Sequence, residues 1–108
     1  MAITSTQTPG TDVRNFAVGR YIDDGTVAAF DITTGFQPRY VRVQNVTSGD
    51  NMEWFEGMDD ASGVKRLTNG TASLVTENGI TVAANGFTVG LDVDICYTSE
   101  QLSWIAIG

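Results

Sequence analysis

Hydrophobic and polar residues alternate most regularly near the C-terminal end of the chain. Apolar or aromatic side chains occupy every second position from Phe87 to Tyr97, and small or polar side chains occupy the positions between them. A period of two is typical of a strand with one buried face and one solvent-facing face. A straight strand of this length is long for a small sheet, so Gly90 and Asp92 predict a bend that divides it in two.

Turn signals separate the other apolar segments into short pieces. The strongest of these signals are three Asn-Gly pairs, which favour tight hairpins. In chain order the turns are Asp24-Gly25, Ser48-Gly49-Asp50, Asn69-Gly70, Asn78-Gly79 and Asn85-Gly86. The segments between them predict nine strands, at residues 15–22, 26–32, 39–46, 52–58, 72–76, 80–83, 87–90, 93–98 and 102–107.

Three segments have more specific patterns. Val41 and Val43 alternate with polar residues and predict a hairpin that returns through residues 48–51 to Met52 and Trp54. The strand at residues 102–107 is apolar on both faces, which is typical of a central strand. No segment has a convincing helical period, and residues 59–66 leave room for a single helical turn.

Composition favours an all-β fold. The chain has 32 Val, Ile and Thr residues against 18 Ala, Leu, Glu and Lys residues, and β-branched side chains fit strands better than helices. Its 108 residues suffice for one core. We therefore expect a compact antiparallel β-sandwich or small β-barrel as a single β domain over residues 12–108. The expected core residues are Trp54, Phe87, Val89, Val93, Ile95 and Trp104.

Residues 1–11 differ from the rest of the chain. They contain one large aliphatic residue besides Met1, and a Pro-Gly breaker comes just before Thr11. Such a segment adds little to a core, so we expect an extended N-terminal arm. We expect the arm to be held by another chain, through strand addition to a sheet edge.

An excess of acidic residues narrows the range of partners. Thirteen acidic against six basic residues give a net charge of −7, which repels the phosphate backbone and argues against nucleic acid as a partner. Residues 67–108 contain four acids and no Lys or Arg, so one end of the molecule should be acidic. The chain has no signal-peptide pattern and no transmembrane-length apolar run. We therefore expect it to fold in a cytoplasm and not to bind a membrane.

The sequence lacks the residues of the common catalytic sites. It has no histidine, which removes the usual acid–base group near neutral pH and His-based metal sites. No Gly-rich segment has phosphate-loop spacing. Cys96 is the only cysteine, which excludes an intramolecular disulfide, and no basic neighbour in sequence activates its thiol. We expect no enzymatic activity and no catalytic, cofactor-binding or metal-binding residue.

Two groups of residues allow a binding function as well as a plain structural one. Asp92 and Asp94 would share one face of a strand, and Asp59-Asp60 is a second acidic pair. Calcium needs six or more oxygen ligands, and the loop of alternating Asp and Asn that ends in Glu is missing. We therefore expect both pairs to be solvated and to bind no metal.

The aromatic residues are the second group. They could form a sugar-stacking surface, but both tryptophans lie on apolar-patterned strands and have a large area to bury, so we expect them in the core. The residues concerned are Tyr21, Tyr40, Trp54, Tyr97 and Trp104.

Five segments carry a resemblance to a known class of protein. They are PRYVRVQNVT at residues 38–47, MEWFEGM at 52–58, NGITV at 78–82, GFTVG at 86–90 and LSW at 102–104. Over roughly residues 30–108 the chain resembles small structural proteins of tailed bacteriophages, and head decoration proteins in particular. These are scaffold motifs of strands and turns, and no functional residue can be carried over from them.

The resemblance implies a function in the virion. It implies a non-enzymatic β domain, commonly a homotrimer, that binds the major capsid protein on the outer surface of the head lattice and stabilises it. The alternative is a receptor-binding or lectin-like module of a phage tail or head fibre. A short arm on a compact body without a repetitive shaft favours the decoration protein.

Overall fold

The structure is a computed structural model that describes residues 15–22, 29–95 and 100–108. Several expectations fall outside these residues. They are the N-terminal arm at residues 1–11, the turn at Asp24-Gly25, the start of the strand expected at 26–32, and the placement of Cys96 and Tyr97.

The described part of the chain is built from strands. They are β1 (Phe16–Ile22), β2 (Phe30–Thr33), β3 (Tyr40–Asn45), β4 (Asn51–Phe55), β5 (Ser62–Arg66), β6 (Ala72–Ala83), β7 (Gly86–Val89) and β8 (Gln101–Ile107). All eight belong to one antiparallel sheet in the order β1-β8-β3-β4-β5-β6-β7-β2.

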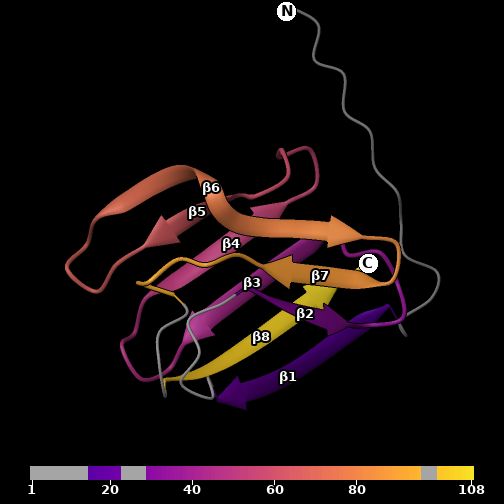
Figure 1. Ribbon diagram of the computed structural model, residues 1–108, viewed down its shortest axis with the longest axis horizontal. Coiled ribbons are helices and arrows are strands. Elements are labelled where there is room, and N and C mark those ends of the chain that lie inside the picture. Colours follow the sequence, from indigo (N-terminus) through magenta and orange to yellow (C-terminus); the bar gives the residue numbers. More distant parts are fainter. Residues whose placement is uncertain (1–14, 23–28, 96–99) are drawn as a thin grey trace, which may run out of the picture.

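The sheet is strongly curled, so its two ends approach each other (Figure 1). The ring of Phe87 on β7 meets the ring of Trp104 on β8 edge-on, with 5.4 Å between the ring centroids. The all-β prediction is confirmed. Of the two expected architectures the small barrel is the closer one, because a single sheet supplies every strand, although β1 and β2 leave it open.

The core lies on the concave face of this sheet. Its buried side chains are Val41, Val43, Met52, Trp54, Ile80, Phe87, Val89, Ile95, Leu102 and Ala106. Four of the six expected core residues are therefore confirmed, and Trp104 is partly buried against the same cluster. The expectation for Val93 is wrong, because its side chain is 58% exposed.

Three of the expected hairpins are present. Val41 lies opposite Trp54 and Val43 opposite Met52, as the alternation of β3 and β4 predicts. Asn69-Gly70 connects β5 to β6, and Asn85-Gly86 connects β6 to β7. The strand at the C-terminal end, β8, lies between β1 and β3, which explains why it is apolar on both faces.

The third Asn-Gly pair does not form a hairpin. Asn78 and Gly79 lie inside β6, where Asn78 has a left-handed φ of 58°. The register shifts here, since Gly63 lies opposite Val75 but Ser62 lies opposite Ile80. The intervening residues form a large bulge, so β6 pairs first with β5 and then with β7. A left-handed Asn followed by Gly suits a bulge as well as a turn.

Two further expectations are corrected. Residues 59–66 hold strand β5 and not a helical turn, because Ser62–Arg66 is needed to pair with both β4 and β6. Residues 93–95 form a turn, so the described part of the strand expected at 93–98 is not extended. In that turn Ile95 reaches the core while Val93 points to solvent.

Candidate functional site

The convex face of the sheet carries a continuous row of apolar and aromatic side chains. Phe16, Ile107, Tyr40 and Phe55 lie opposite one another across β1, β8, β3 and β4. Cross-strand neighbours on one face are close enough to touch, and the Tyr40 and Phe55 rings have centroids 5.2 Å apart. We call these four residues, together with Val18 and Ile105 in the next row, the outer apolar patch.

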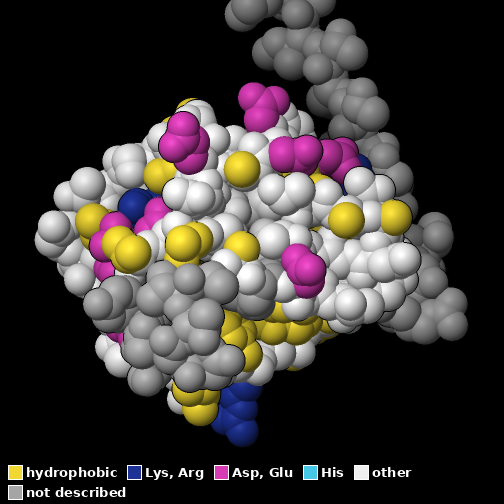
Figure 2. Space-filling view, in the orientation of Figure 1, with side chains coloured by type: hydrophobic (Ala, Val, Ile, Leu, Met, Phe, Trp, Pro, Cys, Tyr) yellow, Lys and Arg dark blue, Asp and Glu magenta, His cyan; other side chains and the backbone are white. Residues whose placement is uncertain are grey.

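The outer apolar patch is accessible in the described structure. Phe16, Val18, Phe55 and Ile107 are 51%, 62%, 46% and 41% exposed. On the face drawn in Figure 2, acidic side chains are most numerous towards β6, and hydrophobic side chains are visible below β7. Scattered exposed apolar residues are ordinary, whereas a contiguous patch makes this face the candidate interaction surface of the described residues.

A polar cluster borders the outer apolar patch on β3, β4 and β5. The hydroxyl of Tyr40 donates a 2.6 Å hydrogen bond to Glu53 Oε2, and the Arg66 guanidinium binds Glu53 Oε1. Burial, followed by the bond to Glu53, raises the pKa of Tyr40 to about 12. The same bond, with Arg66 close by, lowers the pKa of Glu53. The hydrogen bond and ion pair hold these side chains together at the border of the patch.

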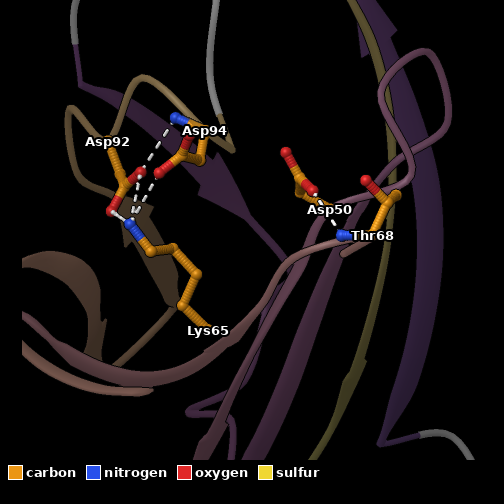
Figure 3. A network of polar contacts seen from close by, with 5 residues as sticks. All are labelled: Asp50, Lys65, Thr68, Asp92 and Asp94. Atoms are coloured by element: carbon orange, nitrogen blue, oxygen red, sulfur yellow. Dashed lines mark hydrogen bonds and ion pairs between the residues drawn. The ribbon is translucent and has the colours of Figure 1, made fainter. Parts of the chain in front are cut away.

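The only lysine of the chain forms a second polar cluster on the other face. Lys65 Nζ on β5 lies 2.8 Å from Asp94 Oδ2 and 3.1 Å from Asp92 Oδ2 (Figure 3). The Asp94 N–H donates to Asp92 Oδ1 at 2.9 Å, which holds the two acids in one turn. The Asp92 side chain is 10% exposed and the Lys65 side chain 15%.

This arrangement corrects the expectation for Asp92 and Asp94. They lie in the turn after β7 and not on one strand, and Asp92 is nearly buried in an ion pair instead of solvated. The bond to Asp94, with Asp92 adding to it, raises the pKa of Lys65. The two ion pairs join β5 to the turn that contains Asp92 and Asp94, and we call this cluster the Lys65 clasp.

A single hydrogen bond makes a second connection between β5 and another part of the sheet. Asp50 Oδ1 accepts a 3.0 Å hydrogen bond from the Thr68 N–H, which joins the loop before β4 to the loop after β5 (Figure 3). The two contacts thus tie β5 and its flanking loop to the rest of the sheet. Sequence reasoning missed the clasp because it expected no strand at residues 59–66, which include Lys65.

Asn45, the last residue of β3, is a buried side chain that connects several segments through hydrogen bonds. It is fully buried, and its Nδ2 group donates to the Ile95 carbonyl at 3.0 Å and to Glu100 Oε1 at 3.1 Å. Its Oδ1 atom accepts bonds from the N–H groups of Thr47 and Ser48, both at 2.9 Å. One side chain therefore fixes both the β3–β4 loop and the described residues on either side of 96–99.

The structure gives the aromatic residues separate roles. Trp54 is 4% exposed and donates its indole N–H to the Asp59 carbonyl at 3.2 Å. A hollow of about 260 Å³ beside it is lined by Gln37, Pro38, Arg39, Trp54, Glu56 and Val82. Little of the indole face is free to stack on a sugar there. Among the described aromatic residues, Tyr40 joins the outer apolar patch while both tryptophans pack in or against the core.

The described residues hold no group of three or more acidic, Cys or His side chains placed to bind a metal ion. Asp59 and Asp60 are exposed in the loop before β5, as expected for the second acidic pair. No helix of the described chain is long and apolar enough to span a membrane.

Comparison of the chain with protein families, with curated proteins and with solved structures finds no match.

Proposed function

We propose that this chain is a non-enzymatic structural protein that decorates the head of a tailed bacteriophage, where it binds the major capsid protein. The observation that carries the proposal is the outer apolar patch, a contiguous apolar surface on a small acidic domain. Such surfaces serve protein–protein contact, because burying them gains roughly 25 cal/mol per Å² of apolar area. The reason for placing the protein on a phage head is the resemblance of residues 38–47 and of the other four segments to head decoration proteins.

Two features support a binding role over a catalytic one. The chain has no histidine, and the polar groups of the Tyr40–Glu53 and Lys65–Asp92 clusters bind one another through hydrogen bonds and ion pairs. The environments of Trp54 and Trp104 offer no exposed indole platform to a glycan, so no observation favours the lectin-like alternative. A decoration protein needs neither kind of site. Copies that bind a repeating lattice together gain from effective concentration even when each footprint is modest.

The proposal is tested by cosedimentation of the purified protein with undecorated heads of the phage that encodes it. Phe55→Ser removes an exposed apolar side chain from the outer apolar patch, and Leu74→Ser removes one that is 67% exposed on β6, outside it. We expect the Phe55 variant to bind about tenfold more weakly, because losing the burial of half a large side chain costs about 1–1.5 kcal/mol.

The Leu74 variant should bind like the unchanged protein. Equal binding by both variants would show that the patch is not the docking surface. Absence of binding to heads, together with measurable affinity for a host glycan, would replace the proposal with the fibre module.

A further inference from the structure

Strand β1 forms one open edge of the sheet, and its hydrogen-bonding groups alternate between two directions. The Gly108 N–H donates to the Asn15 carbonyl at 2.8 Å, which continues the ladder between β1 and β8. In an antiparallel ladder the bonded positions alternate, so Ala17, Gly19 and Tyr21 face β8. The backbone N–H and C=O groups of the even-numbered residues, Phe16 to Ile22, therefore point to the open edge.

The side chains of these same even-numbered residues are bulky and exposed. Phe16, Val18 and Ile22 are 51%, 62% and 67% exposed on the convex face, and Arg20 lies between them. On the concave face of β1, Tyr21 packs against the core, and the position next to Trp104 has no room for a side chain, since a Cβ on Gly19 would lie 2.6 Å from the Trp104 ring. An edge with free backbone groups and an apolar face is a template for another strand.

The other open edge of the described sheet is a poor template. Strand β2 has four residues, and the Thr34 N–H donates to the Asn85 carbonyl at 2.8 Å. By the same alternation only Asp31 and Thr33 point outward from β2. Asp31 also places a negative charge at this edge, a common protection against strand pairing. A contact of β1 with β2 of another copy would leave half of the outward groups of β1 without a partner.

We propose that β1 pairs antiparallel with β1 of a second copy, about a two-fold axis at Gly19. In this register Phe16 lies opposite Ile22 of the second copy and Val18 lies opposite Arg20 of the second copy. All outward-pointing groups from Phe16 to Ile22 then find partners, and the two glycines meet at the axis. The contact is self-complementary, as a two-fold interface requires, and it joins the two sheets into one.

The area involved sets the strength of the contact. The three exposed apolar side chains of β1 offer on the order of 300 Å² of apolar surface per copy. Stable interfaces bury about 800 Å² per partner, so this dimer belongs to the weak class and should dissociate at roughly micromolar concentrations. The dimer is a property of the purified chain and requires no capsid, so its test is independent of the proposed function.

The first experiment removes one outward-pointing N–H group. Val18→Pro deletes a backbone donor at the open edge and leaves the bonds between β1 and β8 in place, because edge strands tolerate proline at such positions. Thr33→Pro is the matched control at the other edge. In analytical ultracentrifugation over a concentration series, we expect the unchanged protein and the Thr33 variant to dimerise and the Val18 variant to stay monomeric.

The second experiment tests the register and does not depend on whether the proline variant folds. Val18→Glu places an acid opposite Arg20 of the second copy, and Val18→Lys places a like charge there, each twice per dimer. Opposite charges across two strands attract and like charges repel. We expect the Lys variant to dimerise at least tenfold more weakly than the Glu variant, and adding Arg20→Glu to the Lys variant to restore the dimer.

Three results would overturn the inference. One is a monomeric protein at concentrations of several hundred micromolar, well above the expected dissociation constant. Another is a trimer, which needs contact between unlike surfaces. The last is equal association of the Glu and Lys variants, which would exclude the proposed register.

Discussion

Single buried polar side chains hold much of this small fold together. Asn45 satisfies both of its polar atoms with four hydrogen bonds and leaves no surface exposed. Its sequence context, at the end of an alternating strand, gives no sign of this role. The pattern of apolar residues locates core strands, but it does not show which polar residue is buried among them.

We predict that Asn45→Ala lowers the free energy of unfolding by about 2–4 kcal/mol, because it leaves buried donors and acceptors without partners. Asn69→Ala is the matched control, since Asn69 Oδ1 accepts one bond from the Thr71 N–H at an exposed turn. That variant should lose less than about 1 kcal/mol. Urea unfolding with an unchanged slope measures both values, and similar losses would show that Asn45 is not a special contact.

The hydroxyl of Tyr40 makes stability depend on pH in alkaline solution. Its pKa is raised to about 12 in the folded chain, from an ordinary value of 10.0. The unfolded chain therefore loses this proton first, and stability falls as the pH rises from about 10 to 12. The raised pKa of Lys65 acts in the same direction. Above its ordinary pKa of 10.5 the lysine loses its proton more readily in the unfolded chain, so its contribution to stability falls as the pH rises further.

We predict that Tyr40→Phe removes the tyrosine share of this loss. Between pH 8 and pH 11 the unchanged protein should lose about 1 kcal/mol more than the variant. Chemical unfolding at the two pH values measures the difference. An equal loss in both proteins would mean that the Tyr40–Glu53 hydrogen bond does not stabilise the neutral phenol.

At the scale of the strands, the sequence predicts most elements but not how they connect. Alternation and turns locate β1, β3, β7 and β8 within one residue, and they locate β4 except that the expected strand ends three residues late. The sequence does not predict strand β5, because the strand is short, contains Gly63 and has Lys65 where an apolar residue would be expected on the concave face. The Asn69-Gly70 signal requires a strand before it as well as after it, and it is the one feature that could have located β5.

Strand β6 shows a different limit of sequence reasoning. Asn78-Gly79 has the residues of a tight turn, yet the chain continues through it as a bulge. A Cβ on Gly79 would lie 2.4 Å from the Ser62 carbonyl oxygen, so the backbone of the preceding hairpin passes close by. That close approach is a tertiary constraint, and a local pattern of residues does not contain it.

The Lys65 clasp joins two elements that are far apart in sequence, and its removal should be costly. Lys65→Met leaves the nearly buried Asp92 without its cation, so we predict a loss of about 2–3 kcal/mol at neutral pH.

The control for the clasp is an exposed ion pair of similar length. Arg39 Nε lies 2.8 Å from Glu56 Oε2, with side chains 44% and 60% exposed. Arg39→Met should cost less than about 1 kcal/mol, because water screens such pairs. Thermal or chemical unfolding of both variants measures the two losses in the free energy of unfolding. Equal losses would show that the clasp stabilises the fold no more than a surface ion pair does.

At the scale of the whole molecule, the distribution of bulky residues explains both the fold and its surface. Trp104 fills the space beside Gly19, so the inward positions of β1 hold Ala17, Gly19 and, where Trp104 leaves room, Tyr21, while Phe16, Val18 and Ile22 face outward. A sequence pattern shows that the two faces of β1 differ, but it does not show which face is buried. The outer apolar patch and the open edge at β1 therefore emerge only from the strand order.

The two proposed contacts share Phe16 and Val18 on β1 but extend from them in different directions. The outer apolar patch continues across the convex face to Phe55 on β4, while self-association uses the backbone edge of β1. A dimer through β1 would present the apolar patches of both copies on one continuous sheet. A dimer with two docking surfaces binds a repeating lattice more tightly than a monomer with one.

We propose that the protein acts by docking its convex sheet face on a phage head. Electron cryomicroscopy of undecorated heads mixed with the purified protein would show where it binds and which face it turns to the capsid. We expect regular density on the outer head surface, with the outer apolar patch turned towards the capsid and the Lys65 clasp away from the docking surface. Density confined to the tail, or bound copies that turn the outer apolar patch to solvent, would contradict it.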